Sequence, residues 1–100
     1  MTPTRKKKPA PATLAELREA LAALDAECVE LLARRVALAR QVGKHKRAAG
    51  LATLDAGREA QVISSAARHA RRVGLPEEDV RNIFWQVVAM SRRVQQDDLS

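Results

Sequence analysis

Aromatic side chains are almost missing from this 100-residue sequence, which contains only Phe84, Trp85 and no tyrosine. Any hydrophobic core must therefore be built from leucine, valine, isoleucine and alanine, and the abundance of leucine and alanine favours helices. The hydrophobic fraction of 46% is that of an ordinary soluble domain. We expect these 100 residues to form one domain.

Cysteine and long apolar runs are scarce as well. Cys28 is the only cysteine, so an internal disulfide is excluded. It falls on an apolar helical stripe, where we expect it to be buried as a small hydrophobe rather than to act as a catalytic thiol. No segment approaches the roughly 20 apolar residues that span a bilayer, and no apolar stretch follows the N-terminal charges as in a secretory signal. We therefore expect a cytoplasmic protein without membrane contact.

Positive charge is concentrated at the N-terminus. The formal net charge is +6, and residues 5–8 supply four cations between Pro3 and Pro9. We interpret residues 1–13 as a disordered, solvated basic tail. The alternative is a nucleic-acid-binding arm, but nothing after the tail shows a nucleic-acid motif, so we expect no nucleic-acid partner.

A heptad-like leucine seam follows the tail. Its apolar positions alternate in steps of three and four, and the one gap is filled by Arg35: Leu14, Leu17, Leu21, Leu24, Cys28, Leu31, Leu38 and Val42. The pattern predicts one helix that stops around Ala49 and Gly50. Some 35 residues form a rod of about 50 Å, longer than a 100-residue globule is wide. The seam therefore needs a partner.

Two shorter helices are predicted after this rod. The first runs from about Asp55 to Val73 and ends at Gly74. Pro76 and the three acidic residues after it predict the start of the second short helix. This helix carries an apolar side up to Gln95 and frays near Asp97. The predicted fold is all-α: a three-helix chain with one long N-terminal helix, in which residues 14–100 form the helical domain and two chains intertwine as a dimer.

Arg35 and Lys46 interrupt the apolar face of the long helix. They are 11 residues apart, close to three turns, and so project from one face about 16 Å apart along the axis. One interpretation is a buried ion pair for Arg35 and a lysine that reaches solvent. Arg18 lies about 100° away from Arg35 around the helix, so a second chain is the better source of Arg18 for one shared pocket.

Polar residues also interrupt the later helices. Ser91 and Gln95 continue an apolar stripe of the last helix, and Asp55, Arg58 and Glu59 open the second helix. Helix-end fraying and local capping explain each set by itself. Taken with Arg35, Lys46 and Arg18, however, they describe a pocket for a compact dianion. His45 and His69 have no acidic or cysteine neighbours at metal-ligand spacing, so we expect no metal site.

The segment from Leu14 to Gln95 resembles the all-helical chorismate mutases, whose three-helix chains form intertwined dimers. The joint order and spacing of several short elements carry this resemblance: Leu17-Arg18, Leu24-Asp25, Arg34-Arg35, Val42-Gly43-Lys44-His45-Lys46, Asp55-x-x-Arg58-Glu59, Ile83-Phe84 and Ser91-x-x-x-Gln95. It implies the rearrangement of chorismate to prephenate in aromatic amino acid biosynthesis, which requires no nucleophile, metal or cofactor.

The resemblance also implies residue roles. Arg18 of one chain and Arg35 of the other would hold the two substrate carboxylates, while Lys46 and Gln95 would donate to the ether oxygen, where charge develops. The remaining matches surround the ring hydroxyl and carboxylates: Asp55 and Glu59 as hydroxyl-binding groups, and Arg58 and Ser91 as supporting contacts. Val42 and Val88 would form apolar walls. Arg92 departs from the pattern, because an apolar wall residue can occupy that position.

Three other functions remain open at this stage. Relatives with the same fold act as isochorismate-pyruvate lyases or aminodeoxychorismate mutases, and they share the carboxylate-binding cations. The set of Asp55, Arg58, Glu59 and Ser91 favours the ordinary mutase, since Glu59 can accept a hydrogen bond from a hydroxyl. The third alternative is a non-enzymatic helical module that dimerises through the seam and binds nucleic acid through the tail.

Overall fold

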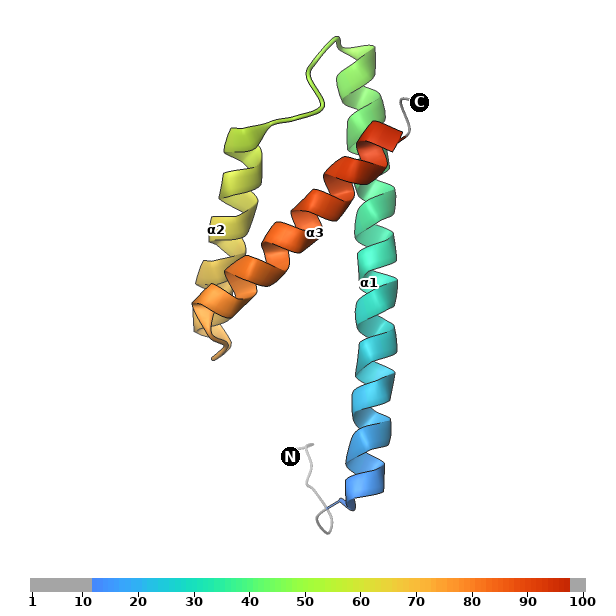
Figure 1. Ribbon diagram of the computed structural model, residues 1–100, viewed down its shortest axis with the longest axis vertical. Helices are drawn as coiled ribbons and strands as arrows, with labels where there is room; N and C mark the ends of the chain where they lie inside the picture. The colour runs from blue at the N-terminus through green and yellow to red at the C-terminus, as the bar shows by residue number, and fades with distance from the viewer. Residues whose placement is uncertain (1–11, 98–100) are drawn as a thin grey trace, which may run out of the picture. The chain divides into compact units, whose positions relative to one another are not determined.

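The computed structural model describes residues 12–97 and contains three helices over that range, with no strand. They are α1 (Leu14–Ala48), α2 (Ala56–Arg72) and α3 (Glu77–Asp97), as Figure 1 shows. The predicted all-α, three-helix fold is confirmed, and each helix boundary lies within two residues of its predicted place. The charged part of the predicted basic tail, residues 5–8, lies outside the described residues.

Short polar motifs start the first two helices. At α1, the Thr13 hydroxyl accepts from the Glu16 amide at 3.1 Å, and the Glu16 carboxylate accepts from the Thr13 amide at 2.9 Å. This reciprocal pair is a capping box, which satisfies two free amides of the first turn. At α2, Asp55 is the N-cap and accepts from the Arg58 amide at 3.0 Å. Local sequence therefore fixes both helix starts.

The same glycine motif ends α1 and α2. Gly50 and Gly74 have φ values of 73° and 81°, a left-handed conformation that favours glycine. After each glycine a leucine amide turns back to a carbonyl five residues earlier, at 2.7 Å for Leu51 and 2.9 Å for Leu75. These are Schellman motifs, and they explain why the chain leaves both helices sharply.

The chain divides into two units, and the boundary lies within α1, between Leu31 and Leu32. In the first unit every described residue is exposed, from Ala12 to Leu31. The seam residues Leu17, Leu21 and Leu24 are 53 to 60% exposed. The expected burial of Cys28 is wrong for the single chain, because its stripe has no neighbour in this unit and the side chain is exposed.

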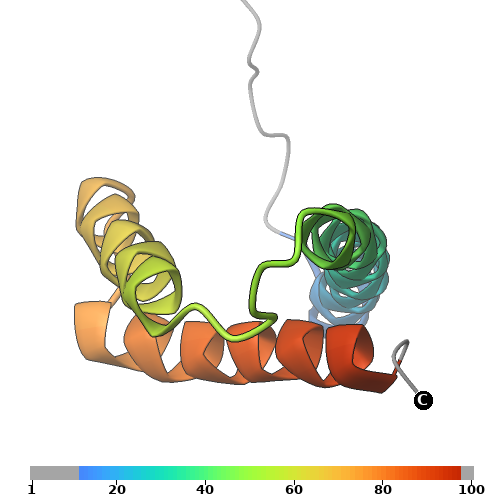
Figure 2. The same cartoon turned by 90° about the horizontal axis from the view of Figure 1, so that it is seen from above.

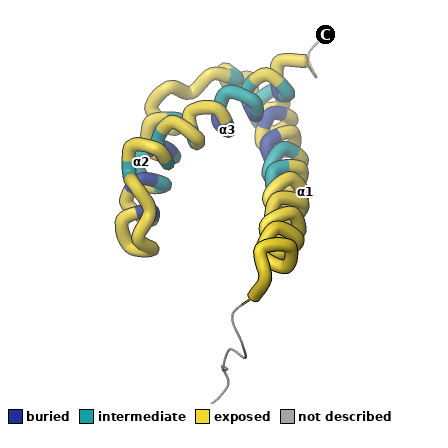
Figure 3. The backbone as a smooth tube through the Cα atoms, turned by 60° about the horizontal axis from the view of Figure 1, so that its bottom comes forward, coloured by how far each residue is buried: buried dark blue, intermediate teal, exposed yellow. Residues whose placement is uncertain are grey.

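The second unit contains the buried core. α2 packs along α3, and Figure 2 shows α2 and the C-terminal part of α1 on the same side of α3. Figure 3 shows dark, buried segments on all three helices. The buried apolar residues are Ala39, Ile63, Ala67, Ala70, Val87 and Val88. Ile83, predicted on the apolar side of α3, is 58% exposed. No helix within residues 12–97 combines the length and hydrophobicity that crossing a membrane requires.

Candidate active site

A pocket lies within the second unit, between the end of α1, the loop after it, the start of α2 and the end of α3. Its volume is about 290 Å³, near the lower end of the range for small-molecule sites. Both polar and aliphatic residues line it: Arg35, Leu38, Ala39, Val42, Lys46, Thr53, Asp55, Arg58, Glu59, Val62, Val88, Ser91, Arg92 and Gln95. Val42 and Val88 thus lie at the wall, as the resemblance implied.

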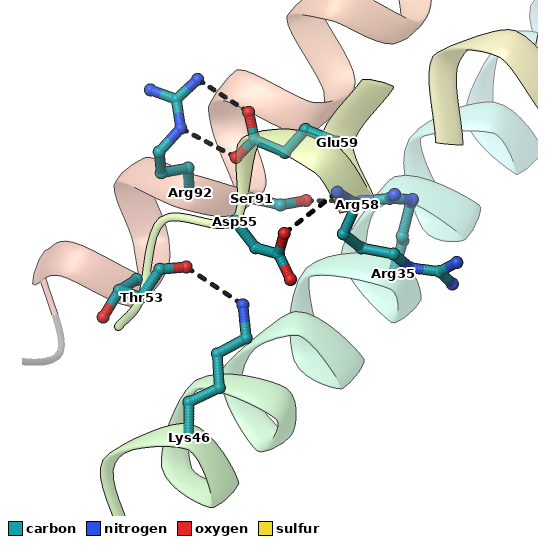
Figure 4. Close-up of polar contacts among 8 residues, drawn as sticks. All are labelled: Arg35, Lys46, Thr53, Asp55, Arg58, Glu59, Ser91 and Arg92. Carbon is teal, nitrogen blue, oxygen red and sulfur yellow. Dashed lines mark hydrogen bonds and ion pairs between the residues drawn. The ribbon is translucent and has the colours of Figure 1, made fainter. Parts of the chain in front are cut away.

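The two cations that α1 contributes to the pocket donate to neutral oxygens. The Arg35 Nη1 atom donates to the Ser91 hydroxyl at 2.6 Å, and the Lys46 ammonium donates to the Thr53 carbonyl at 3.1 Å (Figure 4). The partner of Arg35 is therefore a hydroxyl and not the carboxylate that the ion-pair interpretation required. A guanidinium has five N–H donors and an ammonium three. Both cations therefore retain donors for an anion in the pocket.

Gln95 reaches the pocket from α3 and is anchored on α1. Its side chain is buried, and Nε2 donates to the Ala39 carbonyl at 2.9 Å. An amide nitrogen carries two donors, so one is fixed by the backbone and the second is available to a ligand. The carbonyl fixes the orientation of the amide, which matters for a group that must donate rather than accept.

Gly43 permits this approach of α3 to α1. It is buried within α1, and a Cβ atom built on it would lie 3.1 Å from the Gln95 Cγ and 3.5 Å from the Gln95 Cβ. The 3.1 Å contact is tighter than most Cβ contacts in proteins, so the absence of a Cβ lets Gln95 lie directly on the helix. The sequence shows Gly43 only as a weak point of a helix, because its function depends on which residue packs there.

Asp55 and Arg58 combine local capping with a place in the pocket. The Oδ1 atom of Asp55 caps the Arg58 amide, so the capping interpretation is correct, yet both side chains also line the pocket. One carboxylate oxygen is engaged by the backbone, and a carboxylate accepts through two oxygens. Asp55 therefore retains an acceptor at the edge of the pocket.

Glu59 and Arg92 form the one side-chain ion pair among the described pocket residues. Arg92 Nε donates to Glu59 Oε2 at 3.0 Å, and Nη2 donates to Oε1 at 3.3 Å, as the two dashed lines in Figure 4 show. The hydrogen bond to Glu59, followed by the attraction of the opposite charges, raises the pKa of Arg92. Sequence analysis noted Arg92 only as a departure and did not predict this pair.

The structure thus brings seven of the eight predicted site residues to one pocket. The eighth, Arg18, lies exposed in the first unit, and the residues that line the pocket all belong to the second. The pocket carries four basic side chains and two carboxylates, which leaves an excess of two positive charges. Over residues 12–97, no three His, Cys, Asp or Glu side chains are grouped as metal ligands. The arrangement suits a compact dianion held by fixed donors.

Known proteins resemble the chain over most of its length. Residues 17–96 match the family model described as chorismate mutase type II. The chain is 40% identical to 3-dehydroquinate dehydratase of Pyrobaculum aerophilum over 82% of its own length and 24% of that protein. It is 29% identical to T-protein of Enterobacter agglomerans over 86% of its own length and 23% of that protein. The chain therefore spans about a quarter of the length of these curated relatives.

Proposed function

The chain belongs to the chorismate mutase type II family, and we propose that it catalyses the rearrangement of chorismate to prephenate. The observation that carries the proposal is the pocket's excess of two positive charges, since chorismate is a dicarboxylate. We place the reaction in the cytoplasm, in the biosynthesis of phenylalanine and tyrosine.

In the proposed mechanism, orientation and fixed charges accelerate a concerted rearrangement that needs no covalent intermediate. Arg35 binds one substrate carboxylate, and Ser91 keeps its guanidinium in place through the 2.6 Å hydrogen bond. Holding the flexible side chain of the substrate over its ring removes much of the entropic barrier. Lys46 and Gln95 donate to the ether oxygen as its bond to carbon breaks and negative charge develops there.

The opposite side of the pocket binds the ring hydroxyl in this proposal. Glu59 accepts a hydrogen bond from it, and the free oxygen of Asp55 lies at the same edge of the pocket. Arg58 supports the carboxylates from the start of α2. A hydrogen-bonded hydroxyl gives specificity because a substrate that lacks it leaves a polar group of the pocket unpaired.

We further propose that the working form is a homodimer built on α1. Leu17, Leu21 and Leu24 are more than half exposed, and three leucines on one helical face are typical of a helix that packs against another chain. In this dimer, Arg18 of the partner subunit binds the second carboxylate of chorismate.

The decisive test follows the loss of chorismate by ultraviolet absorbance, with the products separated by chromatography. Prephenate is the expected product. If isochorismate is supplied, release of pyruvate would instead indicate an isochorismate-pyruvate lyase. Turnover of aminodeoxychorismate without turnover of chorismate would indicate an aminodeoxychorismate mutase. No turnover of any of the three, together with salt-dependent binding of nucleic acid, would replace the enzyme by a helical interaction module.

A further inference from the structure

Arg92 is the charged pocket residue that the proposed reaction leaves without a role. It comes from α3, lines the same cavity as the proposed substrate-binding groups, and its side chain is 29% exposed. We propose that Arg92 is a positioning residue, which holds the Glu59 carboxylate in one orientation and neutralises it so that a dianionic substrate can bind beside it. This inference rests on the proposed function.

The geometry of the pair supports the orienting part of this role. Two nitrogens of Arg92 meet the two oxygens of Glu59, at 3.0 and 3.3 Å, across 33 residues of sequence. Such a two-bond contact fixes the plane of a carboxylate, which a single ammonium does not do. Each carboxylate oxygen has a second lone pair, so Glu59 can still accept a hydrogen bond from a hydroxyl.

The charge of the pocket supports the neutralising part. The Glu59 side chain is only 18% exposed, so water screens its charge poorly. Without Arg92, a dianion would enter beside an uncompensated carboxylate, and the excess of positive charge in the pocket would fall from two to one. Repulsion between like charges in one pocket weakens binding. Removing Arg92 should therefore mainly weaken the binding of substrate.

The competing explanation is that the pair only joins α2 to α3. These helices already share an apolar interface with Ile63, Ala67 and Val87 buried, so the pair is not needed to bring them together. The two explanations predict different substrate affinities when the charges of both Arg92 and Glu59 are removed. Removing both charges should restore substrate affinity if Arg92 acts by neutralising Glu59, but not if it acts by joining the helices.

The experiment is a double-mutant cycle on the full chain with chorismate as the probe. We expect Arg92→Leu to raise KM about tenfold with a smaller change in kcat, and Arg92→Lys to restore part of the affinity because it returns the charge without the two-bond geometry. In a Glu59→Gln background, Arg92→Leu should change KM less than about twofold. Arg93→Leu, at the exposed neighbouring position, is the matched control and should leave KM unchanged.

Two results would overturn the inference. An equal rise in KM in both backgrounds would mean that Arg92 acts independently of Glu59. An unchanged KM in Arg92→Leu would mean that it has no positioning role, while turnover by the wild-type protein would leave the proposed function intact. NMR separates the two proposals completely: Glu59→Gln should shift the Arg92 Nε–H resonance whether or not chorismate reacts, and an unshifted resonance would contradict the pair itself.

Discussion

The two units of the chain use the same helix in different ways. Along residues 14–31, α1 presents leucines that nothing in the unit covers. Along residues 32–48, its buried residues are the small Ala39 and Gly43, while the neighbouring Leu38 of the seam stays 61% exposed. Within the chain, the fully buried residues of α1 are therefore small, and the leucines of its seam stay largely exposed, although Leu38 also lines the pocket. The contrast distinguishes the positions of α1 that are buried within this chain from the leucines that we assign to a dimer interface.

Charged substitutions on the seam should give the largest effect. In the double variant Leu21→Glu, Leu24→Glu, four buried leucines of the proposed dimer would become carboxylates. Each buried leucine contributes about 1.5–3 kcal/mol, so the dissociation constant should rise at least about 10³-fold. Sedimentation analysis should show single chains, and activity should fall to background because the partner's Arg18 is lost.

A matched control lies on the opposite face of the same exposed segment. Ala26→Glu adds a carboxylate away from the seam and should leave both mass and activity unchanged. If the seam variant keeps the mass of two chains, the leucines of the first unit do not form the dimer interface.

Removing a single cation from the second unit should give the next largest effect. Lys46→Ala deletes a proposed donor to the ether oxygen and one hydrogen bond to the loop. We expect kcat/KM to fall about 10²- to 10³-fold, as for other preorganised donors, with the helical circular dichroism retained. Lys44→Ala, at an exposed position two residues away, is the control. Equal activity of the two variants would remove Lys46 from the mechanism.

Gly43→Ala tests the close contact of α1 with α3. Alanine favours helix by about 1 kcal/mol over glycine, so α1 itself should not weaken. The new Cβ would nevertheless meet Gln95 at 3.1 Å and displace its amide. We expect kcat to fall about tenfold, since small misplacements of a catalytic group are costly. In Gly57→Ala, the nearest contact would be an ordinary 3.9 Å, and full activity is expected. Full activity in Gly43→Ala would show that the contact is not needed.

The smallest expected effect concerns the corner between α2 and α3. A hydrogen bond from Arg71 is the main cause that lowers the pKa of Glu77 below its ordinary value. The stability it adds is therefore complete above the pKa of the unfolded chain and is lost as the pH falls through the lower folded pKa. Glu77→Gln should lower Tm by about 1–3 °C at neutral pH, and this difference should shrink as the pH falls through the lowered pKa of Glu77. A difference that does not change with pH would assign the effect to another cause.

The helices could be predicted because local signals define them. Gly50 and Gly74 mark two ends, Asp55 marks a start, and the period of the leucines marks the span between Leu14 and Ala48. These signals act within a few residues, so a single sequence contains them completely. The burial of Cys28 was predicted wrongly for the single chain for the same reason: periodicity says which face is apolar, but not which molecule covers it.

The site could be predicted where it violates a pattern. Arg35 and Gln95 stand out because a hydrophobe is expected at each position, and the family resemblance then implied their roles toward the substrate. Gly43 and Arg92 could not be assigned in this way, since one depends on which residue packs on it and the other on a residue 33 positions away. The sequence contains no local trace of such contacts.

The hydrogen bond from Lys46 to Thr53 bears on how quickly a ligand is captured. The ammonium rests on a neutral carbonyl at 3.1 Å rather than on a carboxylate. A carboxylate attracts an ammonium by its full negative charge, whereas a carbonyl does so only by its dipole, so an arriving carboxylate competes well against a carbonyl but poorly against another carboxylate. The cation can thus meet an arriving anion, with a donor that Thr53 does not occupy, without first releasing a counterion.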